Sequence, residues 1–310
     1  MSGLGRRPLG HSGIEVSVVG LGCNQFGGRL DLDGTRAVLD RAIELGITFL
    51  DTADRYGLTK SEELMGTALR GRRAEVVLAT KFGMDVGDGW PGPRGARDYI
   101  RRAAEASLRR LQTDVIDLYY YHRPDGVTPM VETLTALDEL VRAGKVRAIA
   151  ASNFDAAQIR EAEAVSRAHG LARFTAIQNE YSLLHREPEA EVLGLCEQLE
   201  LAFIPFYPLA AGLLTGKYRR GRPGPEGARL SGRERIASDE QWRVVEALGT
   251  YAAERGVMLT EVAIGALLAR PAVASVIAGV TRPEQLQVNA AAASWAPSAT
   301  DLDALWSLTA

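Results

Sequence analysis

The stretch ITFLDTA at residues 47–53, followed by SEELMGTALRG at 61–71, decides the fold. The first segment is a short, mostly apolar run, which is typical of a parallel strand whose outer side is covered. The second has helical spacing, and we expect it to begin with Ser61 as the N-cap and to end at Gly71. A strand followed directly by a helix is the repeating unit of parallel α/β folds.

The same strand-then-helix order continues along the chain. The strand-like segments are residues 16–22, 47–53, 75–81, 115–122, 145–153, 174–182, 201–209 and 275–280. The helical segments are residues 35–46, 61–71, 97–111, 130–144, 155–170, 189–200, 239–256, 259–270 and 283–293. Eight such strands in a chain of 310 residues predict an α/β fold, a (β/α)8 TIM barrel, with residues 1–310 as a single domain. A doubly wound sheet is the competing architecture, but no GxGxxG sequence follows any strand segment.

Composition argues against several classes of partner. The formal net charge of -3 gives no general attraction to nucleic acid or to anionic lipid. No apolar run approaches about 18 residues, so we expect no membrane partner. Cys23 and Cys196 lie far apart and fit no disulfide or metal framework, which indicates a reducing, cytoplasmic location and no metal site.

Polar side chains stand where consecutive strand segments end. Asp51 ends the second strand, with Tyr56 just beyond it, while Lys81 ends the third strand and His122 the fourth. In a parallel barrel the carboxyl ends of all strands meet at one end, where the chemistry of such folds is found. Each residue alone has an ordinary structural explanation, as a loop cap, a packing residue or a loop lysine. Their occurrence at consecutive strand ends favours an active site instead.

These four residue types suit proton transfer to a carbonyl group. A tyrosine with a pKa near 10 is a poor acid–base at neutral pH, and a nearby cation lowers that pKa. Lys81 can supply this charge, Asp51 can hold the ammonium group, and His122 can orient a substrate oxygen. We therefore expect Tyr56 to act as the general acid–base while hydride reaches the carbonyl carbon from a bound cofactor.

The same motifs resemble those of the aldo-keto reductase superfamily. They are D-x-A-x-x-Y-G at residues 51–57, A-T-K at 79–81, L-Y-Y-Y-H-R-P-D at 118–125 and A-S-N-F at 151–154. The resemblance implies a barrel that binds NADPH, with Asp51, Tyr56, Lys81 and His122 as the catalytic tetrad. It also implies an N-terminal β-hairpin, formed by RPLGHSGIEVS around His11, Ser12 and Gly13, which closes the bottom of the barrel.

The resemblance also implies where the cofactor binds. Its contacts carry over to Gly22, Cys23, Asn24, Asp51, Ser152, Asn153, Gln178, Tyr207, Pro208, Leu209, Gly212, Leu213, Lys217, Gly279, Thr281, Arg282, Gln285 and Asn289. Among these, Tyr207 resembles the aromatic residue that stacks on the nicotinamide, and the guanidinium of Arg282 suits a ribose phosphate. Val288 and Thr281 depart from residues common in relatives at the adenine end. NADPH is therefore the expected cofactor, and NADH is a second possibility.

Loops after the strands should form the substrate pocket. We assign to it Asn24, Gln25, Phe26, Tyr56, Met84, Trp90, His122 and Arg123. This mixture suits a small-molecule aldehyde, ketone or keto-sugar, and Trp90 is either a substrate platform or an anchor of its own loop. The arginine-rich residues 215–238, which end near Arg235, form either a basic flap over the cofactor or a solvated loop.

A second function of a different class stays open. The N-terminal pattern and N-E-Y-S-L-L at residues 179–184 resemble the bacterial and potassium-channel β-subunit-like branch of the superfamily. That resemblance implies, as an alternative, a cofactor-binding redox sensor or regulatory subunit with slow turnover.

Overall fold

The core of the protein is a curled parallel sheet. The computed structural model describes residues 4–233 and 236–309, so Arg235 lies outside the described residues. Within this part of the chain, eight parallel strands follow the order β10-β3-β4-β5-β6-β7-β8-β9. Their bounds are β3 (Val19–Gly22), β4 (Phe49–Asp51), β5 (Val77–Phe82), β6 (Ile116–Tyr121), β7 (Val146–Ser152), β8 (Phe174–Gln178), β9 (Ala202–Phe203) and β10 (Val276–Gly279).

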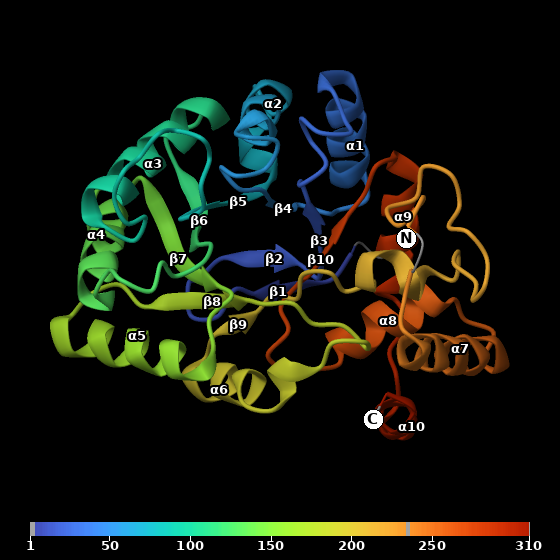
Figure 1. The fold of residues 1–310 in the computed structure, drawn as a ribbon. Coiled ribbons are helices and arrows are strands. Elements are labelled where there is room, and N and C mark those ends of the chain that lie inside the picture. The colour runs from blue at the N-terminus through green and yellow to red at the C-terminus, as the bar shows by residue number, and fades with distance from the viewer. Residues whose placement is uncertain (1–3, 234–235, 310) are drawn as a thin grey trace.

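The first and last strands of this order meet and close the barrel. Isolated parallel bridges join Phe203 to Val273 and Phe206 to Ile277. The backbone N–H of Ile277 donates to the carbonyl of Pro205 at 3.0 Å. The predicted (β/α)8 barrel is therefore confirmed, and Figure 1 looks along it. Strand β9 is shorter than the predicted segment 201–209, because beyond Phe203 only Phe206 of this segment forms bridges with described residues, isolated ones to Glu180 and Ile277.

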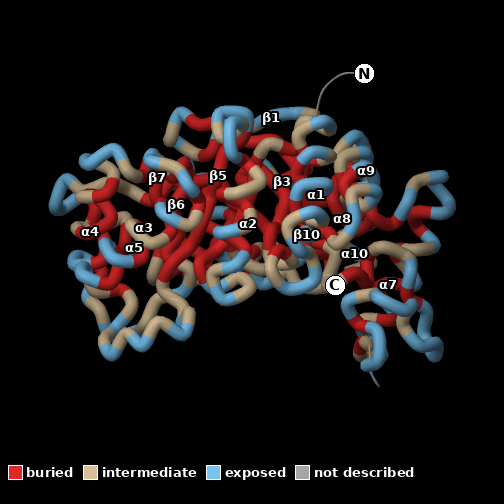
Figure 2. Tube along the Cα trace, turned by 90° about the horizontal axis from the view of Figure 1, so that it is seen from above, coloured by how far each residue is buried: buried red, intermediate tan, exposed pale blue. Residues whose placement is uncertain are grey.

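Helices surround the sheet, as Figure 1 shows. They are α1 (Leu32–Glu44), α2 (Lys60–Ala68), α3 (Arg97–Leu111), α4 (Met130–Arg142), α5 (Ala156–His169), α6 (Val192–Leu199), α7 (Asp239–Glu254), α8 (Leu259–Leu268), α9 (Pro283–Ala292) and α10 (Ala299–Leu308). Short 3-10 turns are η1 (Arg73–Glu75), η2 (Glu187–Glu189) and η3 (Ala210–Thr215). Figure 2 shows the buried strands as an inner layer, with most exposed residues on the outer helices and loops.

One predicted helix start was wrong. Helix α2 begins at Lys60, after Thr59, so Ser61 is not its N-cap. The Ser61 hydroxyl is fully buried and donates to the carbonyl of Cys23 at 2.9 Å. It therefore ties the helix to the end of β3 instead of satisfying the helix N-terminus.

The predicted hairpin is confirmed at the amino ends of the strands. It consists of β1 (Arg6–Pro8) and β2 (Glu15–Ser17), which pair antiparallel. Its Leu9, Ile14 and Val16 are buried in one cluster with inward-facing residues of the barrel strands. The predicted strand 16–22 is instead divided, because β2 pairs with β1 whereas β3 pairs with β10 and β4. At the end of β2, the Ser17 hydroxyl accepts from the backbone N–H groups of Thr48 and Phe49. The hairpin is thereby fixed across the bottom of the barrel.

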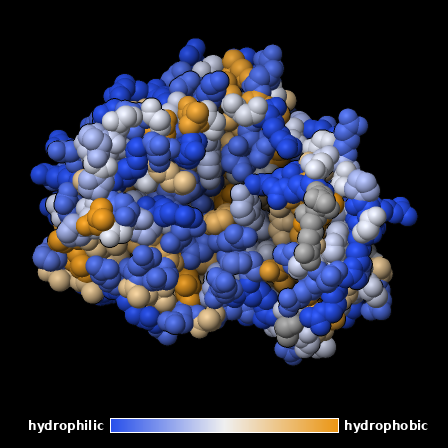
Figure 3. All heavy atoms as spheres, in the orientation of Figure 1, coloured by the Kyte–Doolittle hydropathy of each residue, from blue (hydrophilic) through white to orange (hydrophobic). Residues whose placement is uncertain are grey.

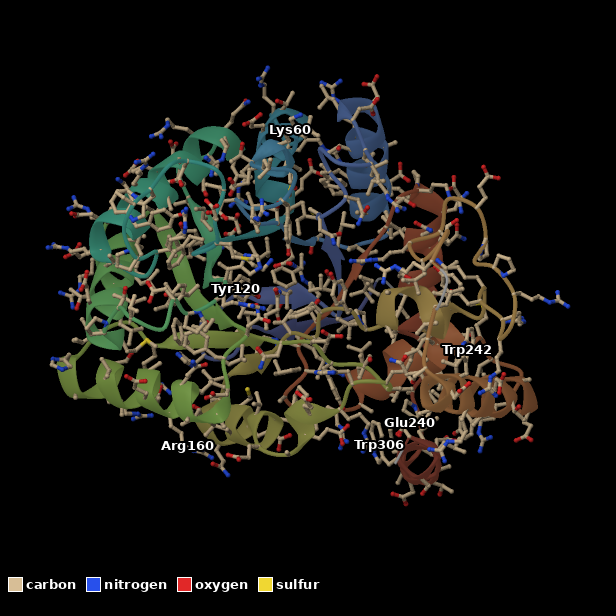
Figure 4. All side chains as sticks on the ribbon, viewed as in Figure 1. Lys60, Tyr120, Arg160, Glu240, Trp242 and Trp306 are labelled. Carbon is tan, nitrogen blue, oxygen red and sulfur yellow. The ribbon has the colours of Figure 1, made fainter. Side chains whose placement is uncertain are left out.

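The C-terminal helix α10 was not predicted from the sequence. Its Trp306 ring contacts two guanidinium groups, 4.7 Å from Arg186 and 4.1 Å from Arg270, measured from each guanidinium carbon to the ring centroid. Figure 4 labels Trp306 beside α10 and Tyr120 near the middle of the barrel. Stacking on two cations holds α10 against the body of the protein, far from the barrel interior.

Candidate active site

A buried ion pair lies at the carboxyl ends of β4 and β5. The ammonium Nζ of Lys81 donates to Asp51 Oδ2 at 2.7 Å and to the backbone carbonyl of Thr52 at 2.8 Å. Gln178, from β8, donates from Nε2 to the other carboxylate oxygen of Asp51 at 3.1 Å. Lys81 is fully buried and Asp51 almost so. Such a pair is tolerable in the interior because these hydrogen bonds replace the water that both charges have lost.

Tyr56 lies directly beside this pair. Its hydroxyl is 3.5 Å from Lys81 Nζ, and its ring centroid is 5.1 Å from the same atom. Burial raises the pKa of Tyr56, and the charge of Lys81 pulls it down without reversing that shift. The net direction differs from the expected lowering because desolvation of the phenolate outweighs the cation. Tyr56 is therefore protonated at neutral pH.

The pKa of Lys81 shifts in a way that keeps it charged. Burial acts to lower its pKa, but Asp51 and then Tyr56 oppose burial, and the net shift is upward. The ammonium group is consequently a permanent positive charge next to the phenol across the physiological pH range.

His122 completes the predicted tetrad. Its ring stands edge-on to the ring of Tyr56, with 6.0 Å between the centroids. Burial, followed by the charges of Lys81 and Arg123, lowers the pKa of His122 to about 3, so the imidazole is neutral. Its Nδ1 is buried and has no hydrogen-bond partner among the described residues. A neutral imidazole of this kind can share a hydrogen bond with a substrate oxygen.

A single cleft of about 1400 Å³ opens over these residues. Figure 3, drawn in the orientation of Figure 1, shows a hollow near the middle of the surface, among largely hydrophilic side chains. The predicted residues that line the cleft are Gly22, Asn24, Gln25, Asp51, Tyr56, Met84, His122, Arg123, Ser152, Asn153, Gln178, Tyr207, Pro208, Leu209, Gly212, Lys217, Gly279, Thr281, Arg282, Gln285 and Asn289. The volume exceeds the roughly 300–1000 Å³ of an ordinary small-ligand pocket, which leaves room for a cofactor and a substrate together.

Five predicted residues stand behind this lining. Lys81 lies beneath Tyr56, while Cys23, Phe26 and Leu213 are buried in the hydrophobic clusters. Trp90 packs against the ring of Tyr99, 5.5 Å away between centroids, and its indole N–H donates to the carbonyl of Pro93. Of the two roles considered for Trp90, these contacts match the anchor of its own loop.

Some lining residues were not anticipated from the sequence. They are Arg29, Arg55, Glu180, Phe206, Ala211, the segments 258–260 and 277–278, and Val280. Thr215, Gly216 and residues 225–229 also line the cleft and belong to the arginine-rich segment 215–238, and Val288 lines it at the expected adenine end. The position of Arg55 could have been predicted, because it lies inside the motif around Tyr56. The position of segment 258–260 could not, since it reaches the cleft only through the packing of α8 against the barrel.

The far end of the cleft suits a phosphate-bearing ligand. Lys217 and Arg282 both line it, and burial together with the neighbouring charge of Arg282 lowers the pKa of Lys217. Two cations held close together favour an anion between them. A side chain at Gly279 would come within 3.0 Å of Asn24 Oδ1, so the absence of one keeps the backbone open there. These residues fit the phosphate groups of a nicotinamide dinucleotide.

Strained backbone accompanies the same wall. Asn153, Tyr207 and Ala211 have positive φ values of 59°, 54° and 56°, and all three line the cleft. Such conformations cost free energy in residues other than glycine and concentrate at ligand sites. The surrounding structure therefore holds these residues in backbone conformations that local sterics disfavour.

Part of the arginine-rich segment forms the outer wall of the cleft. Arg229 donates to the hydroxyl of Tyr207 at 2.8 Å, and its guanidinium lies 4.5 Å from the centre of that ring. Arg29 donates to the carbonyl of Gly227 at 3.2 Å and so connects the segment to the loop after β3. Residues 225–229 thus form part of the lining of the cleft, and the flap over the cofactor stays a prediction.

The described part of the chain shows neither a metal centre nor a membrane-spanning helix. Residues 4–233 and 236–309 contain no cluster of three or more His, Cys, Asp or Glu side chains placed to hold a metal ion. In these same ranges no helix has both the length and the apolar character needed to cross a membrane.

The barrel thus carries a buried lysine–carboxylate pair, a tyrosine and a neutral histidine at the carboxyl ends of its strands, the end where (β/α)8 enzymes have their active sites. The chain is a member of the aldo/keto reductase family, whose family profile matches residues 18–309. The resemblance seen in the sequence is thereby confirmed.

Individual relatives point the same way. The chain is 36% identical over 292 residues to the uncharacterized oxidoreductase YqkF of Bacillus subtilis (strain 168), covering 93% of this chain and 91% of that protein. It is 35% identical over 292 residues to a probable voltage-gated potassium channel subunit beta of Oryza sativa subsp. japonica, covering 91% and 88%. A protein of the same name from Arabidopsis thaliana is 34% identical over 307 residues, covering 95% and 92%. Family membership and the first of these relatives support an oxidoreductase.

Proposed function

We propose that the protein is an NADPH-dependent reductase that converts an aldehyde, ketone or keto-sugar carbonyl group to the alcohol. The observation that carries this proposal is the fully buried Lys81, which is paired with Asp51 and lies 3.5 Å from the Tyr56 hydroxyl at the floor of the cleft. Burying a charge costs desolvation free energy, and such charges are often found at functional sites. Here the buried ammonium group lies beside a hydroxyl that can exchange a proton.

Each residue of the site has a separate role in the proposed reduction. NADPH, when bound, supplies the hydride. Tyr56 holds its proton at neutral pH and donates it from the phenol oxygen to the carbonyl oxygen, and in the reverse direction it accepts that proton. Lys81 stabilises the phenolate that remains, Asp51 and Gln178 hold Lys81 in place, and neutral His122 hydrogen-bonds the carbonyl oxygen.

The cofactor would lie along the wall formed by the ends of β7 to β10. Ser152, Asn153 and Gln178 would bind the carboxamide, and Tyr207 would stack on the nicotinamide ring. Lys217 and Arg282 would bind phosphate groups, with Arg282 favouring NADPH over NADH. We also propose that residues 1–310 form one domain and that the protein is cytoplasmic, since both of its cysteines are buried and unpaired.

Steady-state oxidation of NADPH with 4-nitrobenzaldehyde tests this proposal. The wild-type protein should turn over many times, Tyr56→Phe should not, and NADH should be the weaker cofactor. NADPH binding, measured by fluorescence titration, serves as the control for folding of the variant. Equal rates for the wild type and Tyr56→Phe would contradict the role of Tyr56.

A second function is favoured by two of the relatives. Because these are named as potassium channel β subunits, the alternative is a cofactor-binding regulatory or redox-sensing subunit. Tight NADPH binding with a single slow turnover would support that alternative. Rapid multiple turnover would support the reductase.

A further inference from the structure

Two arginines flank the catalytic residues and line the cleft. Arg55 immediately precedes Tyr56, and Arg123 immediately follows His122. Both side chains are exposed. Neither guanidinium makes a hydrogen bond or ion pair with any residue in 4–233 or 236–309. The two positive charges therefore face the cleft without a protein counter-ion.

Nearby arginines show that this is not a general property of the region. Arg110 donates to the buried carboxylate of Glu62 at 2.6 Å. Arg94 donates to the carboxylates of Asp85 and Asp88. The charges of Arg94 and Arg110 are therefore neutralised by the fold, while those of Arg55 and Arg123 are left for another group.

Acidic residues of the cleft do not supply that group. Asp51 is already engaged by Lys81 and Gln178. Glu180 follows β8, and Glu226 belongs to the arginine-rich outer wall. Neither glutamate forms an ion pair with a described arginine or lysine of the cleft.

The proposed phosphate ligands Lys217 and Arg282 lie across the barrel from Arg123. Lys217 and Arg282 stand on the η3 and α9 side, and α9 follows β10. In the strand order, β6, which carries Arg123 at its end, is four strands from β10 and hence across the barrel. The electrostatic influence of Arg123 instead reaches His122, whose pKa is lowered first by burial, then by Lys81 and then by Arg123. Arg123 thus acts at the position where a carbonyl substrate would bind.

We propose that the substrates are carbonyl compounds that also carry a carboxylate or phosphate group, and that Arg55 and Arg123 bind this anion while the carbonyl lies between Tyr56 and His122. This inference rests on the proposed reductase function and adds the class of substrate. A guanidinium offers paired donors that match the oxygens of a carboxylate or phosphate. The chain has a net charge of -3, so the attraction comes from this local arrangement and not from the protein as a whole.

Two matched aldehydes test the proposal. 4-Carboxybenzaldehyde and 4-nitrobenzaldehyde have nearly the same shape, but only the first is an anion. The ratio of their kcat/KM values is measured for the wild type, Arg55→Gln, Arg123→Gln and the double variant. Arg101→Gln is the matched control, because Arg101 is exposed on α3 and does not line the cleft.

Loss of each charge-assisted contact should lower the carboxy-to-nitro ratio roughly tenfold. The double variant should lower it further, and Arg101→Gln should leave the ratio unchanged. An unchanged ratio in both Arg55→Gln and Arg123→Gln would overturn the proposal. Repeating the measurement with a phosphate-bearing aldehyde, glyceraldehyde 3-phosphate against glyceraldehyde, shows which anion is preferred.

Failure of the reductase function itself would be recognised separately. It would appear as NADPH binding without turnover of either aldehyde. The arginine site is then tested by titrating benzoate and its neutral analogue benzamide into the NADP+ complex. Tighter binding of benzoate that is lost in the two arginine variants would support the anion site, and equal binding of the two ligands would overturn it.

Discussion

The inner and outer walls of the cleft are built in different ways. On the inner wall, the fully buried Lys81 donates hydrogen bonds to Asp51 and to the backbone carbonyl of Thr52. Gln178 donates a third hydrogen bond to Asp51. On the outer wall, Arg229 holds an exposed segment by one hydrogen bond and one cation–π contact with Tyr207, and Arg29 adds one hydrogen bond to Gly227. The inner wall therefore cannot change without loss of several bonds, whereas the outer wall can be displaced at little cost.

This difference matches two separate requirements. Proton transfer needs groups held within a fraction of an ångström, which buried strand ends provide. Exchange of a large cofactor needs an opening, which a lightly held segment provides. Substitutions on the inner wall should therefore have much larger effects than substitutions on the outer wall.

The largest effect should come from the proton donor. Tyr56→Phe removes the only transferable proton of that side chain, so kcat for 4-nitrobenzaldehyde should fall by roughly 10²–10⁴-fold. NADPH affinity should change little, because the phenol ring is kept. A loss of NADPH binding equal to the loss of rate would indicate a structural role instead.

The next effect concerns the buried ion pair. Lys81→Met leaves the Asp51 carboxylate buried without its cation, which should lower the free energy of unfolding by about 3–5 kcal/mol. Urea denaturation at neutral pH measures this loss. The double variant Asp51→Asn/Lys81→Met should recover much of it, and no recovery would show that the stability came from packing of the lysine chain.

His122 should make the free energy of unfolding depend on pH. Its pKa in the folded protein is about 3, below the ordinary value of 6.5. Between these two values the unfolded chain binds a proton that the folded chain does not, so stability is lost as the pH falls from 6.5 toward 3. Between pH 7 and pH 5 the wild type should lose up to about 2 kcal/mol from this source. Denaturation of His122→Asn at both pH values should show a smaller loss, and an equal loss would contradict burial of a neutral imidazole.

A smaller effect is expected where the cofactor phosphates would bind. Arg282→Ala removes one charge-assisted contact, which should weaken NADPH by roughly tenfold and NADH much less. Fluorescence titration with both cofactors measures the difference. An identical change for NADPH and NADH would remove Arg282 from the site of the ribose phosphate.

The smallest effect should come from the outer wall. Arg229→Ala removes an exposed contact with Tyr207, which is worth about 0.5–1 kcal/mol. The rate constant for cofactor dissociation, measured by stopped-flow fluorescence, should therefore rise only a few-fold. An effect as large as that of Tyr56→Phe on kcat would contradict the contrast between the two walls.

The sequence by itself determined the order of elements and the position of the proposed catalytic groups along the chain. Helix α3 occupies residues 97–111 as predicted, because local apolar spacing specifies a helix face. Asp51 and Lys81 could be placed at strand ends because parallel strands bring their carboxyl ends to one edge. These features depend on a few neighbouring residues, so the amino-acid order is sufficient to show them.

Only the tertiary structure decided which groups touch and how they are solvated. Gln178 reaches Asp51 across 127 positions of sequence, and Arg229 covers Tyr207 from a segment without regular structure. Trp90 turned toward Tyr99 and away from the cleft. The upward shift of the Tyr56 pKa likewise follows from burial by several strands at once. Contacts between distant segments and the removal of water arise from the whole barrel, so no local stretch of sequence specifies them.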